Sequence, residues 1–384
     1  MASSAISAPR ARRTPRLPWR RVRSIDWPLV VAVLLAMVAG TLMIYSATLR
    51  MEAATTWDDL VVKQAVFAAA STAILVLMTL TEYRVLLALW VWLYAGIVML
   101  LLALFSLGQV LGGAQRWYDL GGVAIQPSEF SKVVLVICLA AYFERHDVRQ
   151  LRHVVISLGL VALLAFLVVL QPNLSTAILL GVIWLGMAFA AGMRPLHFSL
   201  LALLGAPTLY VALKTNLLQD YQLERVRVML DPMVDASGSG YQSIQSLIAV
   251  GNGGLWGRGF ASGMQTQGGW LPLMYTDNIF ALISEELGFM GGVAFLLLLG
   301  FIVWRVFRAA SVAQDFAGSL IAIGVGTYLL AQTFVNIGVV LQLLPVTGIS
   351  LPLISYGGSS VLAVLTAIGL VQSVLVRRKP LEFA

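Results

Sequence analysis

Few residues in this chain can do acid–base chemistry, and those few stand out against an apolar background. Asp277 lies where a long segment rich in polar residues meets an apolar run. Glu129 and Lys132 follow Pro127 at the start of another apolar run. A carboxylate at such a boundary is suited to act as a general base. A Glu–Lys pair that faces a polar cavity could hold an anionic group of a substrate.

Each of these residues also has a structural interpretation. An Asp just before an apolar helix is often its N-cap, so Asp277 could serve only to start the helix. Glu129 and Lys132, three residues apart, share one helix face and could form an ion pair that fixes helix packing. Glu285 and Glu286 lie two turns beyond Asp277. At least one of them must face the protein interior, and structural pairing is the default expectation for both.

The composition indicates what kind of protein must position these side chains. Of 384 residues, 59% are hydrophobic and 11% are charged, and the mean hydropathy is +0.89. Soluble globular chains contain about 25% charged residues, so this chain has too few to cover a surface in water. The sequence therefore predicts an integral membrane protein. Its single cysteine, Cys138, excludes a disulfide framework and a metal site built on cysteines.

Windows of about 19 residues identify ten apolar runs, each long enough to cross a bilayer as a helix. They cover residues 28–48, 61–80, 85–106, 127–143, 154–171, 174–192, 196–213, 278–303, 317–342 and 352–376. We therefore expect an all-α membrane protein with ten transmembrane helices and both termini on one side. Residues 28–376 form the membrane domain, with tails at 1–27 and 377–384.

Basic residues define the orientation of this domain. The first 27 residues are rich in arginine, and the last helix runs into Arg377, Arg378 and Lys379. Cytoplasmic segments carry an excess of Lys and Arg, so both tails are expected in the cytoplasm. Topology and anionic membrane lipids therefore explain the net charge of +7, and no nucleic-acid partner is expected. The first apolar run is too long for a signal peptide and lacks a small-residue cleavage site, so it is expected to stay as an uncleaved span.

The longest segment outside the spans lies on the outer side, at about 214–277 between the seventh and eighth spans. Its aromatic and apolar residues predict a folded flap rather than disorder. Residues 219–230 predict a short amphipathic helix, and residues 241–250 predict a second helical stretch. The Gly-rich stretch at 251–269 does not match G-x-G-x-x-G, so a dinucleotide site is excluded. Close backbone packing or a loop that contacts substrate remain as explanations.

Two further observations restrict the chemistry of the outer side. His146, His153 and His197 all fall in loops predicted to be cytoplasmic, so Ser-His-Asp, Cys-His and His-based metal sites are excluded there. Residues 344–360 interrupt an apolar region with prolines, glycines and hydroxyls. Broken backbone at membrane depth persists only where protein or a wet cavity satisfies its polar groups. We therefore expect this stretch to line a polar cavity that opens outward.

At these residues the sequence resembles the SEDS family (shape, elongation, division and sporulation), which includes the RodA and FtsW cell-wall polymerases. The resemblance spans all but the N-terminal tail, and its most specific part is Asn336-Ile337-Gly338 with residues 344–348 and 351–360. The other matching stretches are 113–117, 126–129 with Lys132, Gln171-Pro172, 240–242 with Gln245-Ser246, Thr276-Asp277 with Ile279-Phe280, and 285–288.

The resemblance implies a peptidoglycan glycosyltransferase in a bacterial cytoplasmic membrane. Such enzymes polymerise lipid II into glycan strands outside that membrane, usually alongside a class B penicillin-binding protein that crosslinks the strands. The resemblance makes Asp277 the catalytic carboxylate and assigns Glu129 and Lys132 to an essential cavity pair. The first span and the short tails favour the RodA side of the family over the division branch.

The residue inventory suits this chemistry. Attack of a GlcNAc 4-hydroxyl on the anomeric carbon of a lipid-pyrophosphate donor needs one base, for which we propose Asp277. A glycosidase would instead need two carboxylates at a defined separation. Lys132, Arg116 and Arg258 are expected to neutralise the pyrophosphate, with a divalent cation such as Mg²⁺ or Mn²⁺ as a candidate cofactor. Further candidate substrate-binding residues are Gln126, Ser355 and Ser359.

The sequence departs from the family at several positions. Asn173 stands where the family often has Asp, so the role of that Asp cannot be transferred. The family commonly has Pro-Glu and His before Thr-Asp, whereas this chain has Pro272-Leu273 and Tyr275. Gln342 replaces a usual small residue. These departures suggest that the regulation of the protein, or details of its substrate, differ from those usual in the family.

Two other functions compete with the polymerase. Intramembrane charges and a broken helix also suit a flippase for lipid II or a related polyprenyl-linked sugar. Polar residues cluster toward the outer half without an obvious inverted repeat, and this asymmetry favours a catalytic pocket entered from one side. A scaffold that uses small-residue contacts at Gly288 and Gly292 would leave Asp277 and Lys132 without a purpose.

Overall fold

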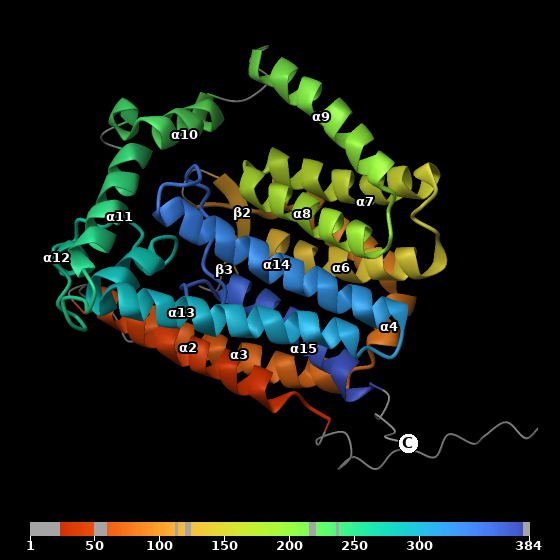
Figure 1. Ribbon diagram of the computed structural model, residues 1–384, viewed down its shortest axis with the longest axis horizontal. Helices are drawn as coiled ribbons and strands as arrows, with labels where there is room; N and C mark the ends of the chain where they lie inside the picture. Colours follow the sequence, from red (N-terminus) through yellow and green to blue (C-terminus); the bar gives the residue numbers. More distant parts are fainter. Residues whose placement is uncertain are drawn as a thin grey trace, which may run out of the picture.

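The computed structural model describes residues 24–49, 60–111, 114–119, 124–214, 220–235 and 238–378. Most of the basic N-terminal tail and of the first outer loop, and the last six residues, lie outside these ranges. The described chain is mainly helical, as the sequence predicts (Figure 1). The helices are α2 (Trp27–Thr48), α3 (Leu60–Leu80), α4 (Tyr83–Ala88), α5 (Trp90–Leu107), α6 (Pro127–Arg145), α7 (Leu151–Leu170), α8 (Leu174–Ala190), α9 (Pro195–Lys214), α10 (Asp220–Leu230), η1 (Pro232–Asp235), α11 (Ser239–Gly253), α12 (Met264–Gln267), α13 (Ile279–Ser311), α14 (Phe316–Val340) and α15 (Gly358–Val376).

Each of the ten predicted spans corresponds to a helix, or to the α4–α5 pair. Seven of the described helices are long and apolar enough to cross a membrane: α2, α3, α5, α7, α13, α14 and α15. α8 is apolar but shorter, and α6 carries charge in its first and last turns. The protein is therefore a multi-pass membrane protein. The full count of ten spans stays a prediction.

The eighth predicted span is not one continuous helix. α13 breaks at Gly288, whose φ of 69° and ψ of −169° lie outside the helical region. A Cβ added at Gly292 would lie 3.5 Å from Phe280 Cζ and 3.5 Å from Ser284 Oγ. On a straight helix residues 280 and 292 would be about 18 Å apart, so the first segment folds back against the second. Hydrophobicity does not reveal this break, because it depends on the backbone freedom of one glycine.

The last span begins later than predicted. α15 starts at Gly358 rather than at residue 352, because residues 351–357 form turns and Leu353 has a φ of 67°. The predicted interruption of the backbone in this region is thereby confirmed.

A small antiparallel sheet occupies the second outer loop, where no strand is predicted from sequence. Its strands β1 (Gln109–Leu111), β2 (Ala114–Asp119) and β3 (Ala124–Ile125) pair in the order β1-β2-β3. Their shortness explains why the sequence pattern does not reveal them, since two or three residues give too little alternation. β3 leads directly into α6, and β2 carries Arg116.

The described part of the long outer segment, residues 220–235 and 238–277, is folded, as predicted. α10 matches the expected amphipathic helix, and α11 extends the expected stretch at 241–250. Figure 1 shows α10, α11 and α12 gathered at one end of the bundle, with α11 and α12 beside the first part of α13. The predicted topology assigns this end to the outer side of the membrane.

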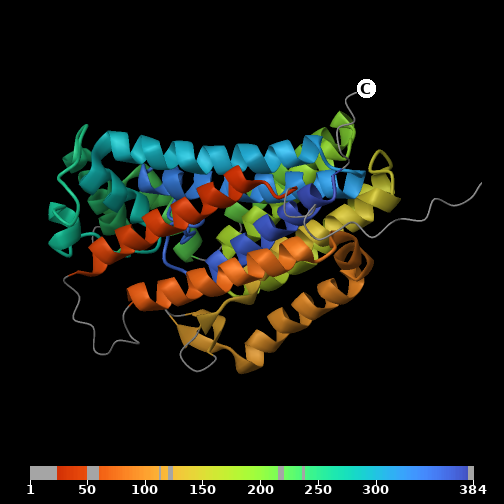
Figure 2. The same cartoon turned by 90° about the horizontal axis from the view of Figure 1, so that it is seen from below.

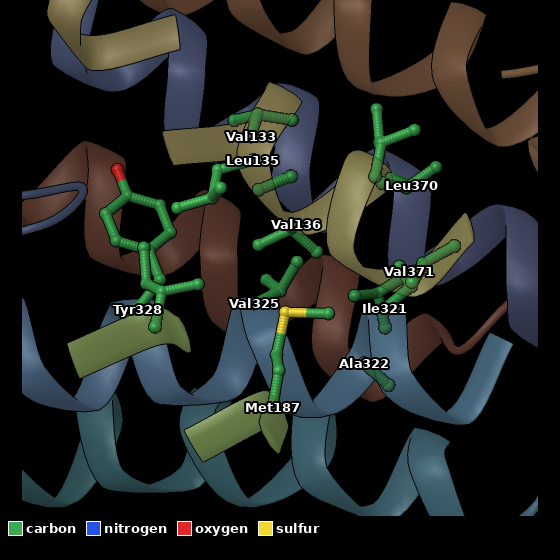
Figure 3. Close-up of a cluster of buried hydrophobic side chains, with 14 of the residues drawn as sticks. Val133, Leu135, Val136, Met187, Ile321, Ala322, Val325, Tyr328, Leu370 and Val371 are labelled. Carbon is green, nitrogen blue, oxygen red and sulfur yellow. The ribbon is translucent and has the colours of Figure 1, made fainter. Parts of the chain in front are cut away.

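The centre of the bundle is formed by α15, α14 and α6. α15 is the most buried of the seven apolar spans, at 83%, whereas α3 and α5 are each 17% buried and face outward. Figure 2 shows α3 lying alongside α15. Figure 3 shows Val136 of α6, Met187 of α8, Val325 of α14 and Val371 of α15 in one apolar cluster. This packing fixes α6 against α14, and the candidate site lies where their outer ends meet the broken segment 341–357.

Candidate active site

Asp277 lies in the turn just before α13, and it is not the helix N-cap. The N-cap residue is Asn278, which makes no capping hydrogen bond through its side chain. Within the described residues the Asp277 carboxylate accepts no hydrogen bond. The structural interpretation of Asp277 as a cap is therefore wrong, and the carboxylate is available for another role.

Three hydrogen bonds hold the main chain around Asp277 to the broken segment and to α14. Asn336 Nδ2 donates to the Asp277 carbonyl at 2.8 Å. Ser355 Oγ donates to the Thr276 carbonyl at 2.6 Å, and the Tyr356 amide donates to the Tyr275 carbonyl at 2.8 Å. The backbone of this turn is thus fixed, while the Asp277 carboxylate has no hydrogen-bond donor in the part of the chain that the structure describes.

The surroundings of Asp277 favour its neutral form more than water would. Burial raises the pKa of Asp277 to about 6, and the positive charge of Arg225 on α10 acts in the opposite direction. A carboxyl group with a pKa close to the working pH is suited to accept a proton. Arg225 is therefore an electrostatic neighbour of Asp277 that the sequence did not select, although it lies on the predicted amphipathic helix.

Glu129 and Lys132 form the predicted ion pair in the first turns of α6. Lys132 Nζ lies 2.9 Å from Glu129 Oε2, and the Lys132 side chain is 1% exposed against 12% for Glu129. Lys132 Nζ also donates to Gln332 Oε1 at 3.2 Å and lies 4.7 Å from the ring centroid of Tyr328. Lys132 is thus a buried cation whose contacts come from both α6 and α14.

The broken segment is bonded to both amides of α14 that contact Lys132 and the Asp277 main chain. Asn336 Nδ2 donates to the Ile349 carbonyl at 2.7 Å, and Gln332 Nε2 donates to the Ser350 carbonyl at 2.9 Å. Gly348 has a φ of 71°, and a Cβ added there would lie 3.7 Å from Asp277 Oδ2. The segment therefore passes close to the carboxylate, as its predicted place in the site requires.

Three buried polar atoms in this region have no hydrogen-bond partner in the described part of the chain. They are the Tyr328 hydroxyl, Asn336 Oδ1 and Thr347 Oγ1. Buried polar atoms are almost always hydrogen-bonded, so such a group of exceptions indicates a place for water or for polar groups of a ligand.

Arg116 makes contacts with the α7–α8 turn. Its Nε donates to the Gln171 carbonyl at 2.8 Å, and its Nη2 donates to the Pro172 carbonyl. The next residue, Asn173, caps α8 by accepting from the Thr176 amide at 3.2 Å. Asn173 is therefore the N-cap of α8. The Asp that the family often has at this position could cap the helix in the same way.

Gln126 and Ser359 join the small sheet to the start of α15. The main-chain N–H of Gln126 donates to Ser359 Oγ at 2.9 Å, and Ser359 Oγ donates to the Ala124 carbonyl at 3.1 Å. Ser355 also accepts from the Leu351 amide at 2.8 Å. These three candidates thus have structural contacts around the site. Their contact with substrate stays a prediction.

Arg258 lies on the Gly-rich stretch beside the break in α13. Its side chain is exposed, its Nε donates to the Asn252 carbonyl at 2.8 Å, and its amide donates to the Glu285 carbonyl at 3.0 Å. These contacts are with α11 and α13 rather than with the Asp277 turn. The predicted role of Arg258 in holding pyrophosphate stays a prediction.

The glycines near Arg258 serve close backbone packing. A Cβ at Gly257 would overlap the Glu286 carbonyl oxygen, and a Cβ at Gly288 would overlap the Gly257 nitrogen. Of the two explanations left open by the sequence, close packing is the one the structure supports.

Glu285 and Glu286 are both fully buried, and both have partners. The Glu285 carboxylate accepts from the main-chain N–H groups of Gln265 and Thr266, at 2.7 and 3.0 Å. Glu286 accepts from Ser46 Oγ on α2, at 2.7 Å to its Oε2. The expectation of structural pairing is confirmed for both residues. They fix the flap and α2 to α13.

The sequence analysis did not name Gln332 or Asn336 as site residues, although Asn336 lies in the most specific part of the family resemblance. The signal was present, because two amides four residues apart interrupt an apolar run and so share one helix face. The described residues contain no group of three or more His, Cys, Asp or Glu side chains placed to hold a metal ion. A divalent cation would therefore have to bind single carboxylates and the phosphates of a substrate.

Comparisons with known proteins agree with this geometry. A family model described as "Cell cycle protein", FTSW_RODA_SPOVE, matches residues 26–380. Stage V sporulation protein E of Bacillus subtilis is 36% identical over 365 residues, which are 91% of this chain and 97% of that protein. Peptidoglycan glycosyltransferase MrdB of Escherichia coli is 39% identical over 293 residues, covering 76% of this chain and 79% of that protein.

Solved structures share the fold. A chain from a structure described as "Structural coordination of polymerization and crosslinking by a peptidoglycan synthase complex" has a TM-score of 0.79 and 31% identity, covering 91% of this chain and 97% of that one. The rod shape determining protein RodA of Thermus thermophilus has a TM-score of 0.68 and 27% identity, covering 93% and 98% of the two chains.

Proposed function

The chain belongs to the FtsW/RodA/SpoVE family, and we propose that it uses Asp277 as the general base of glycan polymerisation. Relatives named as peptidoglycan glycosyltransferases match most of its length. The protein is therefore a peptidoglycan glycosyltransferase, and what is proposed concerns its substrate, residues and partners.

The proposed reaction joins two lipid II molecules, or lipid II and a growing strand. The 4-hydroxyl of a GlcNAc residue attacks the anomeric carbon of the donor sugar and transfers its proton to Asp277. A new C–O bond forms at that carbon while the bond to the pyrophosphate oxygen breaks. Polyprenyl pyrophosphate leaves with the bonding electrons, and the configuration at the anomeric carbon inverts.

One observation carries this proposal: the Asp277 carboxylate has no hydrogen-bond donor among the described residues, although its backbone is clamped by Asn336 and Ser355. A base held this way can reach a substrate hydroxyl without first breaking a bond of its own. Burial raises the pKa of Asp277 to about 6, so the carboxylate is ionised at neutral pH and still basic enough to accept a proton.

Cations near the site would stabilise the leaving group. Lys132 is the best placed, because it is buried in the same network of contacts as the broken segment. Arg116 and Arg258 are proposed as further contacts to phosphate oxygens. Further proposed substrate contacts are Glu129, Gln126, Ser355 and Ser359.

A divalent cation, Mg²⁺ or Mn²⁺, remains part of the proposal. Mg²⁺ often binds through one or two carboxylates together with substrate phosphates. When bound, the cation would supply charge neutralisation at the pyrophosphate. Loss of activity on chelation, with recovery on addition of Mg²⁺ or Mn²⁺, would support it.

The partner and the location are further parts of the proposal. A solved structure with this fold is described as a peptidoglycan synthase complex that coordinates polymerisation and crosslinking. We therefore propose a class B penicillin-binding protein as partner, and a place in the cytoplasmic membrane with both termini in the cytoplasm.

The test is polymerisation of lipid II by the purified protein, with a candidate transpeptidase, resolved on a gel. Asp277→Asn should reduce the rate by about 10²- to 10⁴-fold, the range typical for loss of a general base. Asp231→Asn is the matched control, because Asp231 is also an acid of the outer segment but is exposed. Equal rates for Asp277→Asn and the parent would remove Asp277 from the mechanism.

A further inference from the structure

Two amide side chains on α14, Gln332 and Asn336, link the parts of the candidate site. They lie four residues apart, so they point in the same direction from successive turns of the helix. Both are 1% exposed. Each donates to a main-chain carbonyl of the broken segment, Gln332 to Ser350 and Asn336 to Ile349. Two adjacent carbonyls of that segment are thereby held to successive turns of α14.

The remaining bonds of the two amides go to the Lys132 ammonium and to the main chain of Asp277. Gln332 Oε1 accepts from Lys132 Nζ at 3.2 Å. Asn336 Nδ2 uses its second hydrogen to donate to the Asp277 carbonyl at 2.8 Å. One amide therefore holds the buried cation, and the other holds the turn that carries the carboxylate.

The chemistry of the contacts requires amides at both positions. A lysine ammonium only donates, so the oxygen of Gln332 must face Lys132 and its NH₂ group must face Ser350. Both contacts of Asn336 are to carbonyl oxygens, so they need the two hydrogens of one NH₂ group. A carboxylate of the same shape could still accept from Lys132 at position 332, but it could donate to neither carbonyl.

We propose that Gln332 and Asn336 form a two-amide brace that sets the position of the Asp277 carboxylate relative to Lys132 during catalysis. This inference rests on the proposed function of Asp277 as the base. Both amides are positioning residues, since their contacts are with Lys132 and with backbone rather than with reacting atoms. A small displacement of a reacting group can cost about 10²-fold in rate, so the brace should act mainly on kcat.

A matched control lies at the other end of the bundle. Gln372 on α15 is 0% exposed, donates to the Asp26 carbonyl and accepts from the Asp26 amide, both at 3.0 Å. Gln372→Glu therefore loses the same kind of bond in the same kind of environment. Unlike Gln332 and Asn336, Gln372 makes no hydrogen bond with Lys132, with the Asp277 turn or with the broken segment in the described part of the chain.

The first measurement is steady-state polymerisation of lipid II by the full-length variants. Gln332→Glu and Asn336→Asp should each lower kcat by about 100-fold, with KM within about threefold of the parent value. Gln372→Glu should leave both kcat and KM near the parent values. The uncharged Asn336→Leu and Gln332→Met should each lower kcat as well. Their double variant should lose less than the product of the single losses, because the brace acts as a unit.

The second measurement does not depend on activity. Carbodiimide labelling of Asp277, followed by mass spectrometry across a pH series, reports the ionisation of this one carboxyl group. Its midpoint should rise in Asn336→Asp, because a second acid beside the turn disfavours the Asp277 anion. It should be unchanged in Gln372→Glu.

The two proposals can fail separately. If Asp277→Asn polymerises lipid II as fast as the parent, the proposed base fails, while the labelling still tests the brace. If the brace variants match Gln372→Glu in kcat and in the labelling midpoint, the brace is overturned although the base stands. Should the Asp variant not fold, Asn336→Leu supplies the same comparison without added charge.

Discussion

Asn336 on α14 donates a 2.8 Å hydrogen bond to the main-chain carbonyl of Asp277, 59 residues earlier in the chain. The bond fixes the backbone of Asp277 and leaves its carboxylate free of donors within the described chain. Position and reactivity are thus supplied by different atoms of the same residue. The predictions below test this arrangement and the elements that support it.

The pH dependence of the rate should report Asp277. Burial raises the pKa of this carboxyl group to about 6, and only the ionised form can accept a proton. The value of kcat/KM should therefore rise about tenfold per pH unit below pH 6 and level off above it. A rate that stays constant from pH 5 to pH 8 would contradict the assignment of Asp277 as the base.

Removing the positive charge of Arg225 should shift that profile. Arg225 lowers the pKa of Asp277 against the larger opposing effect of burial. In Arg225→Met the rising limb of the pH profile should move to higher pH, so that the plateau of kcat/KM begins at a higher pH than in the parent. Arg227→Met, on the same helix, is the control and should leave the limb in place.

Asp277→Asn should make the protein more stable at alkaline pH. The pKa of Asp277 is raised by burial to about 6 from 3.8, so the folded state favours the proton. The stability from that protonation is present below the unfolded value and is lost as the pH rises through 6. At pH 8 the substitution should therefore stabilise by up to about 3 kcal/mol, with little effect at pH 4. Thermal unfolding in detergent at both pH values provides the check; an equal shift at both would argue against burial as the cause.

Loss of Lys132 should harm the fold more than loss of the whole ion pair. Lys132→Met leaves Glu129 without its cation in a largely buried place, which costs about 3–5 kcal/mol for a fully buried pair. Adding Glu129→Gln to Lys132→Met should restore part of the thermal stability but none of the polymerase activity. Recovery of activity in the double variant would show that the pair is structural only.

Gly288→Ala should disrupt the outer end of α13. Gly288 has a φ of 69°, and a Cβ there would overlap the Gly257 nitrogen. Destabilisation of several kcal/mol is expected, as for other substitutions that combine strain with overlap. Gly300→Ala, in the same helix with open space at its Cβ, should be neutral or slightly stabilising. Comparable melting temperatures for the two variants would refute this account of the break.

The spans, the amphipathic outer helix and the candidate residues Asp277, Glu129 and Lys132 could be predicted from the sequence. Hydrophobicity and helical spacing are local properties, and a charged residue in an apolar run is visible in the sequence itself. The sequence also determined that residues 344–360 could not form a regular span, since prolines and glycines interrupt them.

Only the tertiary structure decided which of these groups meet. Asn336 and Gln332 join residues from α6, α14 and the broken segment, and Glu286 turns inward to Ser46, 240 residues away in the chain. The fold-back at Gly288 and the small sheet that carries Arg116 are likewise absent from any local pattern. Such contacts depend on how helices pack, and packing depends on the shapes of side chains far apart in sequence rather than on the composition of any one segment.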